Sequence, residues 1–240
     1  MKKNVNKNAY GESQASLDYW KNHRNSLNDL YPSERHFLEP ALRISNSTLD
    51  IGCAAGGAYR FTKEANLNID YTGIDISKSL IEIARESNPK GNFIHYDGQN
   101  IAFKENQFDF VFSIGVLHHL DNWKSIIMQM VKCSSKLTIF DLRLTKGNTH
   151  DDAKSNYQYI SFDDNIDYKA SIGYFVINIG EFISFLQNNF NDSIYRIESF
   201  GYYSNINKKI TIVPYDKVYM CCIKIEKRSQ SPGIFVKLID

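Results

Sequence analysis

The chain has 240 residues, a length that favours one α/β domain with a sizeable core and one or two appended pieces. Its 28 basic and 27 acidic residues nearly balance and form no polybasic stretch, which disfavours nucleic acid and anionic membranes as partners. The first eight residues contain no apolar segment and no run is long enough to span a bilayer, so we predict a cytoplasmic protein without a membrane span. The cysteines show no CxxC or metal-ligand spacing, so we predict no metal and four reduced, structural thiols: Cys53, Cys133, Cys221 and Cys222.

The N-terminal region has a helical pattern. Apolar residues from Leu17 to Leu30 fall on one stripe, and Ser16 is the predicted N-cap. Pro32 suits the first turn of a second, short helix that we expect to end near Pro40.

A turn of small residues follows the first predicted strand. The apolar run at residues 48–51 contains Asp50 near its end and continues into Gly52, Cys53, Ala54 and Gly56. Small side chains let a ligand approach the backbone where a buried parallel strand leads into a helix. The carboxylate suits cationic or hydroxyl donors of a ligand, and the helix N-terminus suits an anionic group.

Two further predicted strands end in acids. Residues 71–75 end in Asp75, and Ser77 can cap the helix that follows at residues 78–86. Residues 92–96 form the next strand and lead into Asp97 and Gly98. An acid in the position of Asp75 can accept hydrogen bonds from ribose hydroxyls.

A fourth strand is predicted at residues 108–113, and the segment 113–120 follows at its carboxyl end. Ligands of open parallel sheets bind outside this edge. A helix should then run through Val131, and a fifth strand should end near Asp141 and Arg143. These two residues either contact a substrate or form an ion pair.

The rest of the chain predicts one more helix and a hairpin. The apolar pattern lapses between residues 145 and 177, resumes as a helix at 179–190, and ends in two strands at 194–200 and 218–225. The segment between these strands is rich in turn residues. The tail at 226–240 fits either an added strand or a docking segment.

The pattern Asp50-x-Gly52-x-Ala54-x-Gly56 resembles motif I of the class I S-adenosylmethionine-dependent methyltransferases, with alanine at the middle glycine. The run Leu117-His118-His119 resembles the small-molecule subfamilies. The resemblance covers residues 49–225 and implies a three-layer, Rossmann-like, doubly wound sheet of seven strands, with strand seven antiparallel. It also implies a single methyltransferase domain over residues 1–240, with an N-terminal helical cap at 1–45 and a lid insertion at 145–177.

The resemblance implies S-adenosylmethionine as the cofactor. The residues that it places around this cofactor are Trp20, Arg24, Asp50, Gly52, Cys53, Ala54, Gly56, Asp75, Ile76, Asp97, Gly98, Ser113, Ile114, Gly115 and His118. Tyr10 and Tyr19 are further lid candidates from the cap. Trp20 could instead dock its helix on the domain, and Arg24 could be a solvated charge.

His118 and His119 are the candidate catalytic residues. An imidazole near the methyl group could take a proton from an acceptor hydroxyl, because its ordinary pKa lies near working pH. Either histidine could instead be purely structural. The sequence also lacks the Asn/Asp-Pro-Pro-aromatic motif that many nitrogen-methylating enzymes carry at this position.

We therefore predict a methyltransferase that acts on oxygen or nitrogen of a small-molecule acceptor, such as a sugar or glycan precursor or a secondary metabolite. The alternatives are a catalytically silent partner subunit that binds the cofactor, an RNA methyltransferase, and a nicotinamide-dependent oxidoreductase. The sequence leaves the oligomeric state open.

Overall fold

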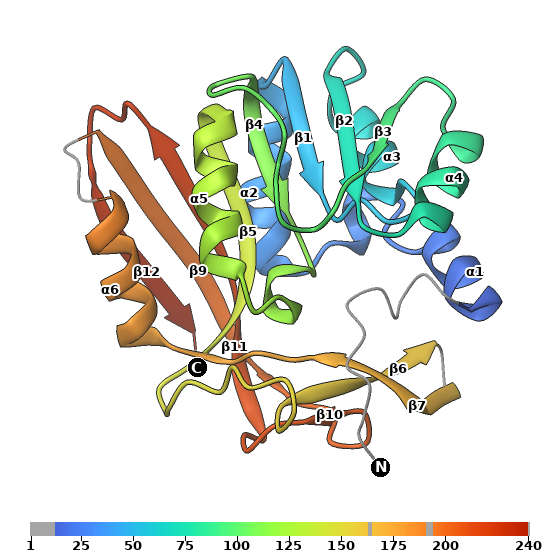
Figure 1. The fold of residues 1–240 in the computed structure, drawn as a ribbon. Helices are drawn as coiled ribbons and strands as arrows, with labels where there is room; N and C mark the ends of the chain where they lie inside the picture. The colour runs from blue at the N-terminus through green and yellow to red at the C-terminus, as the bar shows by residue number, and fades with distance from the viewer. Residues whose placement is uncertain (1–12, 163–164, 191–193, 240) are drawn as a thin grey trace.

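A mixed sheet forms the centre of the protein in a computed structural model, which describes residues 13–162, 165–190 and 194–239 (Figure 1). Its parallel half has the order β3 (Asn92–His95), β2 (Asp70–Asp75), β1 (Ser47–Ile51), β4 (Phe108–Ser113) and β5 (Ser134–Thr145). The sheet continues through β11 (Lys217–Lys227), β9 (Tyr195–Asn205) and β12 (Gly233–Ile239), and the short β8 (Ile177–Asn178) pairs with β5. The predicted fold class is confirmed, since β11 is the antiparallel seventh strand between β5 and β9.

The sheet has more strands than expected. The tail forms β12, which pairs in parallel with β9, so the tail is an added strand. β9 also extends to Asn205, into the segment where turns were expected, and β10 (Thr211–Ile212) follows it.

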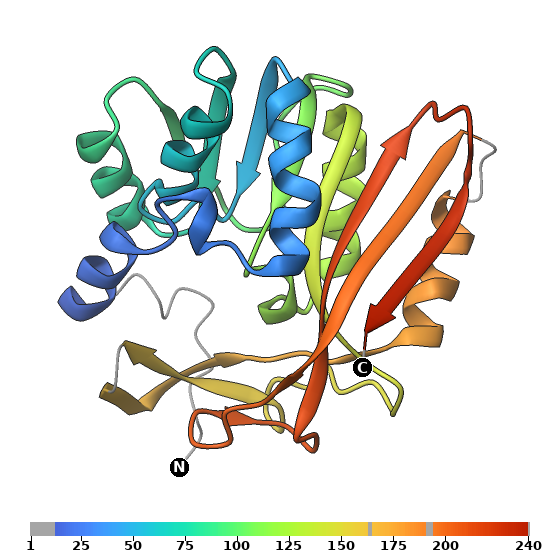
Figure 2. The same cartoon turned by 180° about the vertical axis from the view of Figure 1, so that it is seen from behind.

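Helices cover both faces of the sheet. In Figure 2, α2 (Pro32–Ile44) and α3 (Gly57–Ala65) lie in front of the sheet and α5 (Trp123–Cys133) lies behind it. Side chains of α2, α3 and α4 (Lys78–Ser87) share one apolar cluster, and those of α5 and α6 (Ile179–Phe190) share another. Cys221 belongs to the second cluster and Cys222 to the first, as expected for adjacent strand residues that point to opposite faces. All four cysteines are buried and free.

The N-terminal helices differ from the prediction. Helix α1 (Gln14–Asn22) begins after Ser13, whose hydroxyl accepts the Ser16 N–H at 3.2 Å, so Ser13 is the N-cap and the assignment of Ser16 was wrong. The stripe through Leu30 is not one helix. The Asp29 carboxylate accepts the backbone N–H groups of Asn25 and Ser26, which stabilises a separate 3₁₀ turn, η2 (Leu27–Asp29).

The helix α2 does not stop near Pro40 but continues to Ile44. Proline inside a helix removes one hydrogen bond and crowds the preceding turn. Beyond it, however, Ala41 and Leu42 are buried in the core, and their burial favours the additional helical turn. Helix α5 similarly extends past the predicted Val131 to the buried Cys133.

A second, three-stranded antiparallel sheet lies across the carboxyl ends of the parallel strands. It consists of β10, β6 (Tyr157–Phe162) and β7 (Asn165–Gly173), and we call it the small sheet. In Figure 1 the small sheet lies below the carboxyl ends of the parallel strands, and α1 lies above the end of the sheet where β6 meets β7. Within the residues that the structure describes, no helix is long and apolar enough to cross a membrane.

We expect replacement of Ile126 by alanine to lower the free energy of unfolding by about 2–5 kcal/mol, because this side chain is fully buried between α5 and the sheet. Replacement of Met128, an exposed residue of the same helix, should change it by less than about 0.5 kcal/mol. Urea unfolding of both variants measures the difference. Equal effects would contradict the placement of α5.

Candidate active site

A cavity of about 520 Å³ lies between the carboxyl ends of the parallel strands and the small sheet. This volume is within the usual range of small-molecule sites. The predicted site residues that line it are Trp20, Arg24, Asp50, Gly52, Cys53, Ala54, Asp75, Ile76, Asp97, Gly98, Ile114, Gly115, His118 and His119. Tyr19 also lines it, whereas Tyr10 lies outside the described residues. Gly56 and Ser113 were predicted to line the site but do not.

The turn after β1 explains why small residues are needed there. Gly52 and Gly56 have positive φ angles of 84° and 79°. A side chain at Gly52 would clash with Val116, and one at Gly56 would come within 2.7 Å of Asn88. Gly56 therefore shapes the turn and the start of α3.

Ala54, at the position of the missing middle glycine, also has a positive φ of 46°. This conformation costs about 1–2 kcal/mol for a residue with a Cβ atom. Its N–H donates to Asp75 Oδ2 at 2.9 Å, and a hydrogen bond to a carboxylate offsets a cost of this size. The alanine is therefore compatible with the loop.

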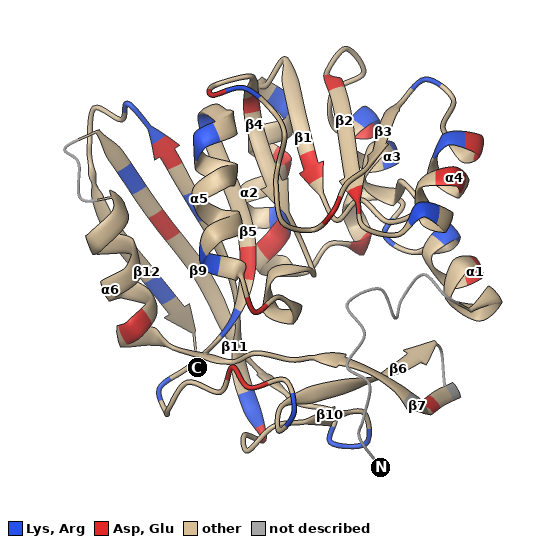
Figure 3. Cartoon of the chain, viewed as in Figure 1, with Lys and Arg blue, Asp and Glu red and all other residues tan. Residues whose placement is uncertain are grey.

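Two buried carboxylates face the cavity from the ends of β1 and β2, where Figure 3 shows acidic residues. Asp75 also accepts the Ser77 N–H at 2.8 Å, and burial raises its pKa against these backbone hydrogen bonds. Asp50 accepts the Tyr71 hydroxyl at 2.6 Å. Burial raises the pKa of Asp50 to about 7, although the Tyr71 hydrogen bond opposes the shift. Each carboxylate retains lone pairs for donors of a ligand.

Asp97 is exposed at the rim of the cavity. Its Oδ1 accepts the backbone N–H groups of Gln99 and Asn100 at 2.7 and 2.8 Å, which hold the pKa of Asp97 below its ordinary value. The next residue, Gly98, has a φ of 76°, and a side chain there would lie 2.9 Å from Ile76. Asp97 thus closes the loop that brings Gly98 to the cavity wall beside Ile76.

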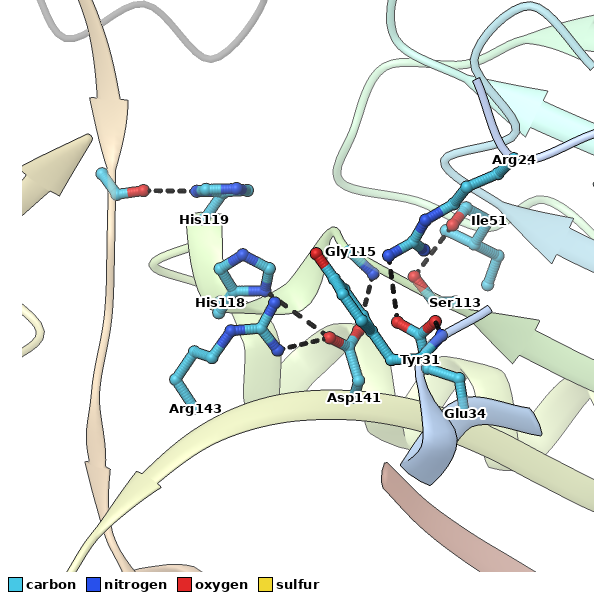
Figure 4. A network of polar contacts seen from close by, with 11 residues as sticks. Arg24, Tyr31, Glu34, Ile51, Ser113, Gly115, His118, His119, Asp141 and Arg143 are labelled. Carbon is cyan, nitrogen blue, oxygen red and sulfur yellow. Dashed lines mark hydrogen bonds and ion pairs between the residues drawn. The ribbon is translucent and has the colours of Figure 1, made fainter. Parts of the chain in front are cut away.

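Arg24 is not a solvated charge. Its guanidinium pairs with Glu34 Oε1 at 3.0 Å, and its side chain is 16% exposed (Figure 4). A Cβ atom at Gly115 would lie 3.4 Å from the Arg24 guanidinium, so Arg24 faces the loop after β4. Burial raises the pKa of Glu34 to about 7 in spite of Arg24. Glu34 was not predicted as a site residue from the sequence. Its position in the first turn of α2 was the signal that could have identified it.

The loop after β4 is fixed by two contacts to neighbouring strands. The Ser113 hydroxyl donates to the carbonyl of Ile51 at 2.8 Å, so its role is to join β4 to β1. The N–H of Gly115 donates to Asp141 Oδ1 at 2.6 Å, and Asp141 Oδ2 accepts from Arg143 at 2.6 Å. The ion-pair interpretation of Asp141 and Arg143 is confirmed, and the pair is buried.

The two histidines occupy different environments. His119 Nδ1 lies 2.7 Å from the carbonyl of Gly173, so Nδ1 donates and Nε2 is the acceptor nitrogen of the neutral ring. Burial lowers the pKa of His119 to about 4. His118 is buried, its Nδ1 makes no hydrogen bond within the described part of the chain, and burial lowers its pKa further.

Residues 49–136 match the family model described as a methyltransferase domain. The chain is 41% identical over 71 residues to the tRNA (carboxymethyluridine(34)-5-O)-methyltransferase of Saccharomyces cerevisiae, covering 30% of this chain and 24% of that protein. It is 29% identical over 144 residues to the O-methyltransferase rstn1 of Aspergillus nomiae, covering 55% and 64%. The matches thus span from about a quarter to less than two-thirds of these relatives.

The fold is similar to that of the plantazolicin methyltransferase BpumL, solved in complex with SAH, with a TM-score of 0.60, 15% identity and coverage of 93% and 94%. A methyltransferase from Mesorhizobium loti gives a TM-score of 0.54 at 13% identity, covering 84% of this chain and 100% of that one. The chain therefore has the class I S-adenosylmethionine-dependent methyltransferase fold. Its segment 49–136 matches the methyltransferase domain model, and the BpumL structure of the same fold holds SAH, the demethylated form of S-adenosylmethionine.

The charges of residues that line the cavity suit this cofactor. Asp50 and Asp75 would accept hydrogen bonds from its amine and hydroxyl groups, and Arg24 would pair with its carboxylate. Within residues 13–162, 165–190 and 194–239, no group of three His, Cys, Asp or Glu side chains could hold a metal ion.

We expect Asp75→Asn to weaken binding of S-adenosylhomocysteine about 10–100-fold, because hydrogen bonds to a charged group contribute about 1.5–3 kcal/mol. Asp70→Asn changes the exposed first residue of the same strand and should leave affinity unchanged. Calorimetric titration of both variants, with their melting temperatures checked, provides the comparison. Unchanged affinity in Asp75→Asn would contradict the assignment.

Cofactor affinity should rise as pH increases from about 5.5 to 7.5. In the ligand-free fold, Asp50 with a pKa of about 7 keeps its proton where an unfolded carboxyl has lost it, and the ligand's ammonium group favours the ionised form. The Asp50→Asn variant should bind weakly with little pH dependence. Since Glu34 titrates in the same range, Glu34→Gln is the matched control. A pH dependence that disappears only in Glu34→Gln would exclude Asp50 as its origin.

Proposed function

We propose that the protein transfers the methyl group of S-adenosylmethionine to a small acceptor held between the strand ends and the small sheet. The observation that carries the proposal is the continuity of the cavity. One wall contains the residues that fit the cofactor, and the other contains polar side chains of β6, β9 and β10, such as Gln158, Ser204 and Thr211. The small sheet would then be the lid over the acceptor.

The cofactor supplies an electrophilic methyl group, and the chain must align an acceptor atom with it. The Gly115 loop lines the cavity and is held by the hydrogen bond to Asp141. A rigid loop at this point restricts where both partners can sit, which is the main contribution that the protein can make to such a displacement.

His119 is the better candidate for the group that takes the acceptor's proton. Its hydrogen bond to Gly173 fixes the tautomer with Nε2 as acceptor, and its ring lines the cavity. His118 lies deeper, beside Asp141 at 3.9 Å. Because the pKa of His119 is about 4, this base is matched to an acceptor that loses its proton readily.

An RNA acceptor is the second candidate, because four of the curated relatives are named tRNA methyltransferases or probable tRNA methyltransferases: those of Saccharomyces cerevisiae, Schizosaccharomyces pombe, Mus musculus and Homo sapiens. Each of these matches covers less than two-fifths of this chain. The nearly balanced charge and the position of the small sheet across the strand ends favour the small acceptor.

The experiment is methyl transfer from tritium-labelled S-adenosylmethionine to separated fractions of small molecules, bulk tRNA and protein. We expect label in the small-molecule fraction, and we expect His119→Ala to reduce the rate about 100-fold while S-adenosylhomocysteine affinity is kept. His36→Ala, an exposed histidine of α2, should transfer at the wild-type rate.

Label in tRNA alone would replace the proposal with the RNA alternative. Cofactor binding without label in any fraction would favour a silent partner subunit. Full activity of His119→Ala would exclude this histidine as the proton acceptor.

A further inference from the structure

The charges that line the cavity are divided between its two halves. Its three carboxylates, those of Asp50, Asp75 and Asp97, lie at the ends of β1, β2 and β3, and Arg24 of the N-terminal region adds one cation. We call this earlier part of the lining the cofactor half. Among the described lining residues that follow position 140 in the chain, Arg143 alone carries a formal charge. We call these later residues the acceptor half.

Arg143 is placed in the acceptor half by the register of three strands. Met220 of β11 is the partner of Arg143 in β5 on one side and of Tyr202 in β9 on the other. Side chains directly opposite one another point to the same face of a sheet. All three line the cavity, so the guanidinium lies in a row with an apolar side chain and a phenol.

Arg143 donates to Asp141 and to the Tyr174 hydroxyl, and its Nε donor has no partner among the described residues. Nη1 donates to Asp141 Oδ2 at 2.6 Å, whereas Asp141 Oδ1 is occupied by the N–H of Gly115. Nε is buried and makes no hydrogen bond within the described part of the chain. A guanidinium has five N–H donors, and a buried one commonly binds a carboxylate through two of them.

The charge of Arg143 persists in this environment. Burial alone would lower the pKa of Arg143, but the adjacent Asp141 carboxylate outweighs it and holds the pKa above its ordinary value. Asp141 does not line the cavity, whereas Arg143 does, so a ligand meets the cation and not its partner. His118 and His119 have lowered pKa values and are neutral near pH 7.

We propose that Arg143 is the centre of an anion-binding subsite, and that the acceptor carries a carboxylate which this guanidinium recognises. The inference rests on the proposed function, since it treats this half of the cavity as the acceptor site. A planar carboxylate matches the planar fork of the guanidinium, and a cationic acceptor would be repelled by it. The amide and hydroxyl groups of Gln158, Ser204 and Thr211 can bind the uncharged part of the same molecule.

The experiment compares three probes of the same shape on the wild-type protein saturated with S-adenosylhomocysteine: benzoate, benzamide and benzylammonium. Saturation first shows that the cofactor half binds its ligand. The bound S-adenosylhomocysteine also occupies Arg24, so this second cation is not free to bind the probes. We expect benzoate to bind at least tenfold more tightly than benzamide in ligand-observed NMR titrations, and benzylammonium not to bind. Equal binding of benzoate and benzamide, or tighter binding of benzylammonium, would overturn the subsite.

Variants locate the binding. Arg143→Met should lower benzoate affinity at least tenfold and keep S-adenosylhomocysteine affinity, whereas Arg196→Met, on β9 outside the cavity, should change neither. Where Arg143→Met does not fold because Asp141 loses its partner, Arg143→Lys keeps the charge without the fork and should still weaken benzoate binding. Unchanged benzoate binding in Arg143→Lys and in any folded Arg143→Met would refute the role of Arg143. If the wild-type protein did not bind S-adenosylhomocysteine at all, the proposed function itself would be refuted.

Discussion

The site depends on burying three carboxylates, those of Asp50, Asp75 and Asp141, at one edge of the sheet. A buried carboxylate is costly unless donors surround it, and each of these has donors from another part of the chain. Asp50 accepts from Tyr71 of the neighbouring strand, Asp75 from the turn after β1 and from the start of α4, and Asp141 from the Gly115 loop and Arg143. The same hydrogen bonds that make burial tolerable therefore fix the loops that surround the cavity.

This arrangement also explains the pKa shifts. Burial raises the pKa of Asp50 to about 7 and also raises that of Asp75, so the ligand-free site holds ionised carboxylates only with difficulty. A ligand that brings an ammonium group and hydroxyls supplies the missing donors. The free energy spent on burial is thereby partly recovered on binding, which ties the chemistry of the ligand to the stability of the strand ends.

The parts of the fold that the sequence predicted are those with strong local signals. Apolar strands that end in acids, the small-residue turn and the amphipathic α6 are recognisable because their patterns repeat within a few residues. The errors fall where distant contacts decide. Pro40 lies inside α2 because later residues of that helix are buried. The N-cap of α1 was predicted at Ser16 and not at Ser13, because both serines precede the apolar stripe and fit the same capping pattern. The small sheet could not be predicted, because β10 joins β6 from about 50 residues further along the chain.

The two halves of the cavity differ in how the chain builds them. Most of the cofactor half comes from the ends of β1 to β4, within residues 49–136, the segment that matches the family model, and Trp20 and Arg24 add to it from the N-terminal region. Arg143, Tyr174, Tyr202 and the side chains of the small sheet all lie beyond that segment. Since loops and added strands can change while a buried parallel sheet must keep its packing, acceptor choice can differ between proteins that share the cofactor half. Under the proposed function, the acceptor would be determined by residues 143–220, and among the described residues of that segment that line the cavity only Arg143 carries a formal charge.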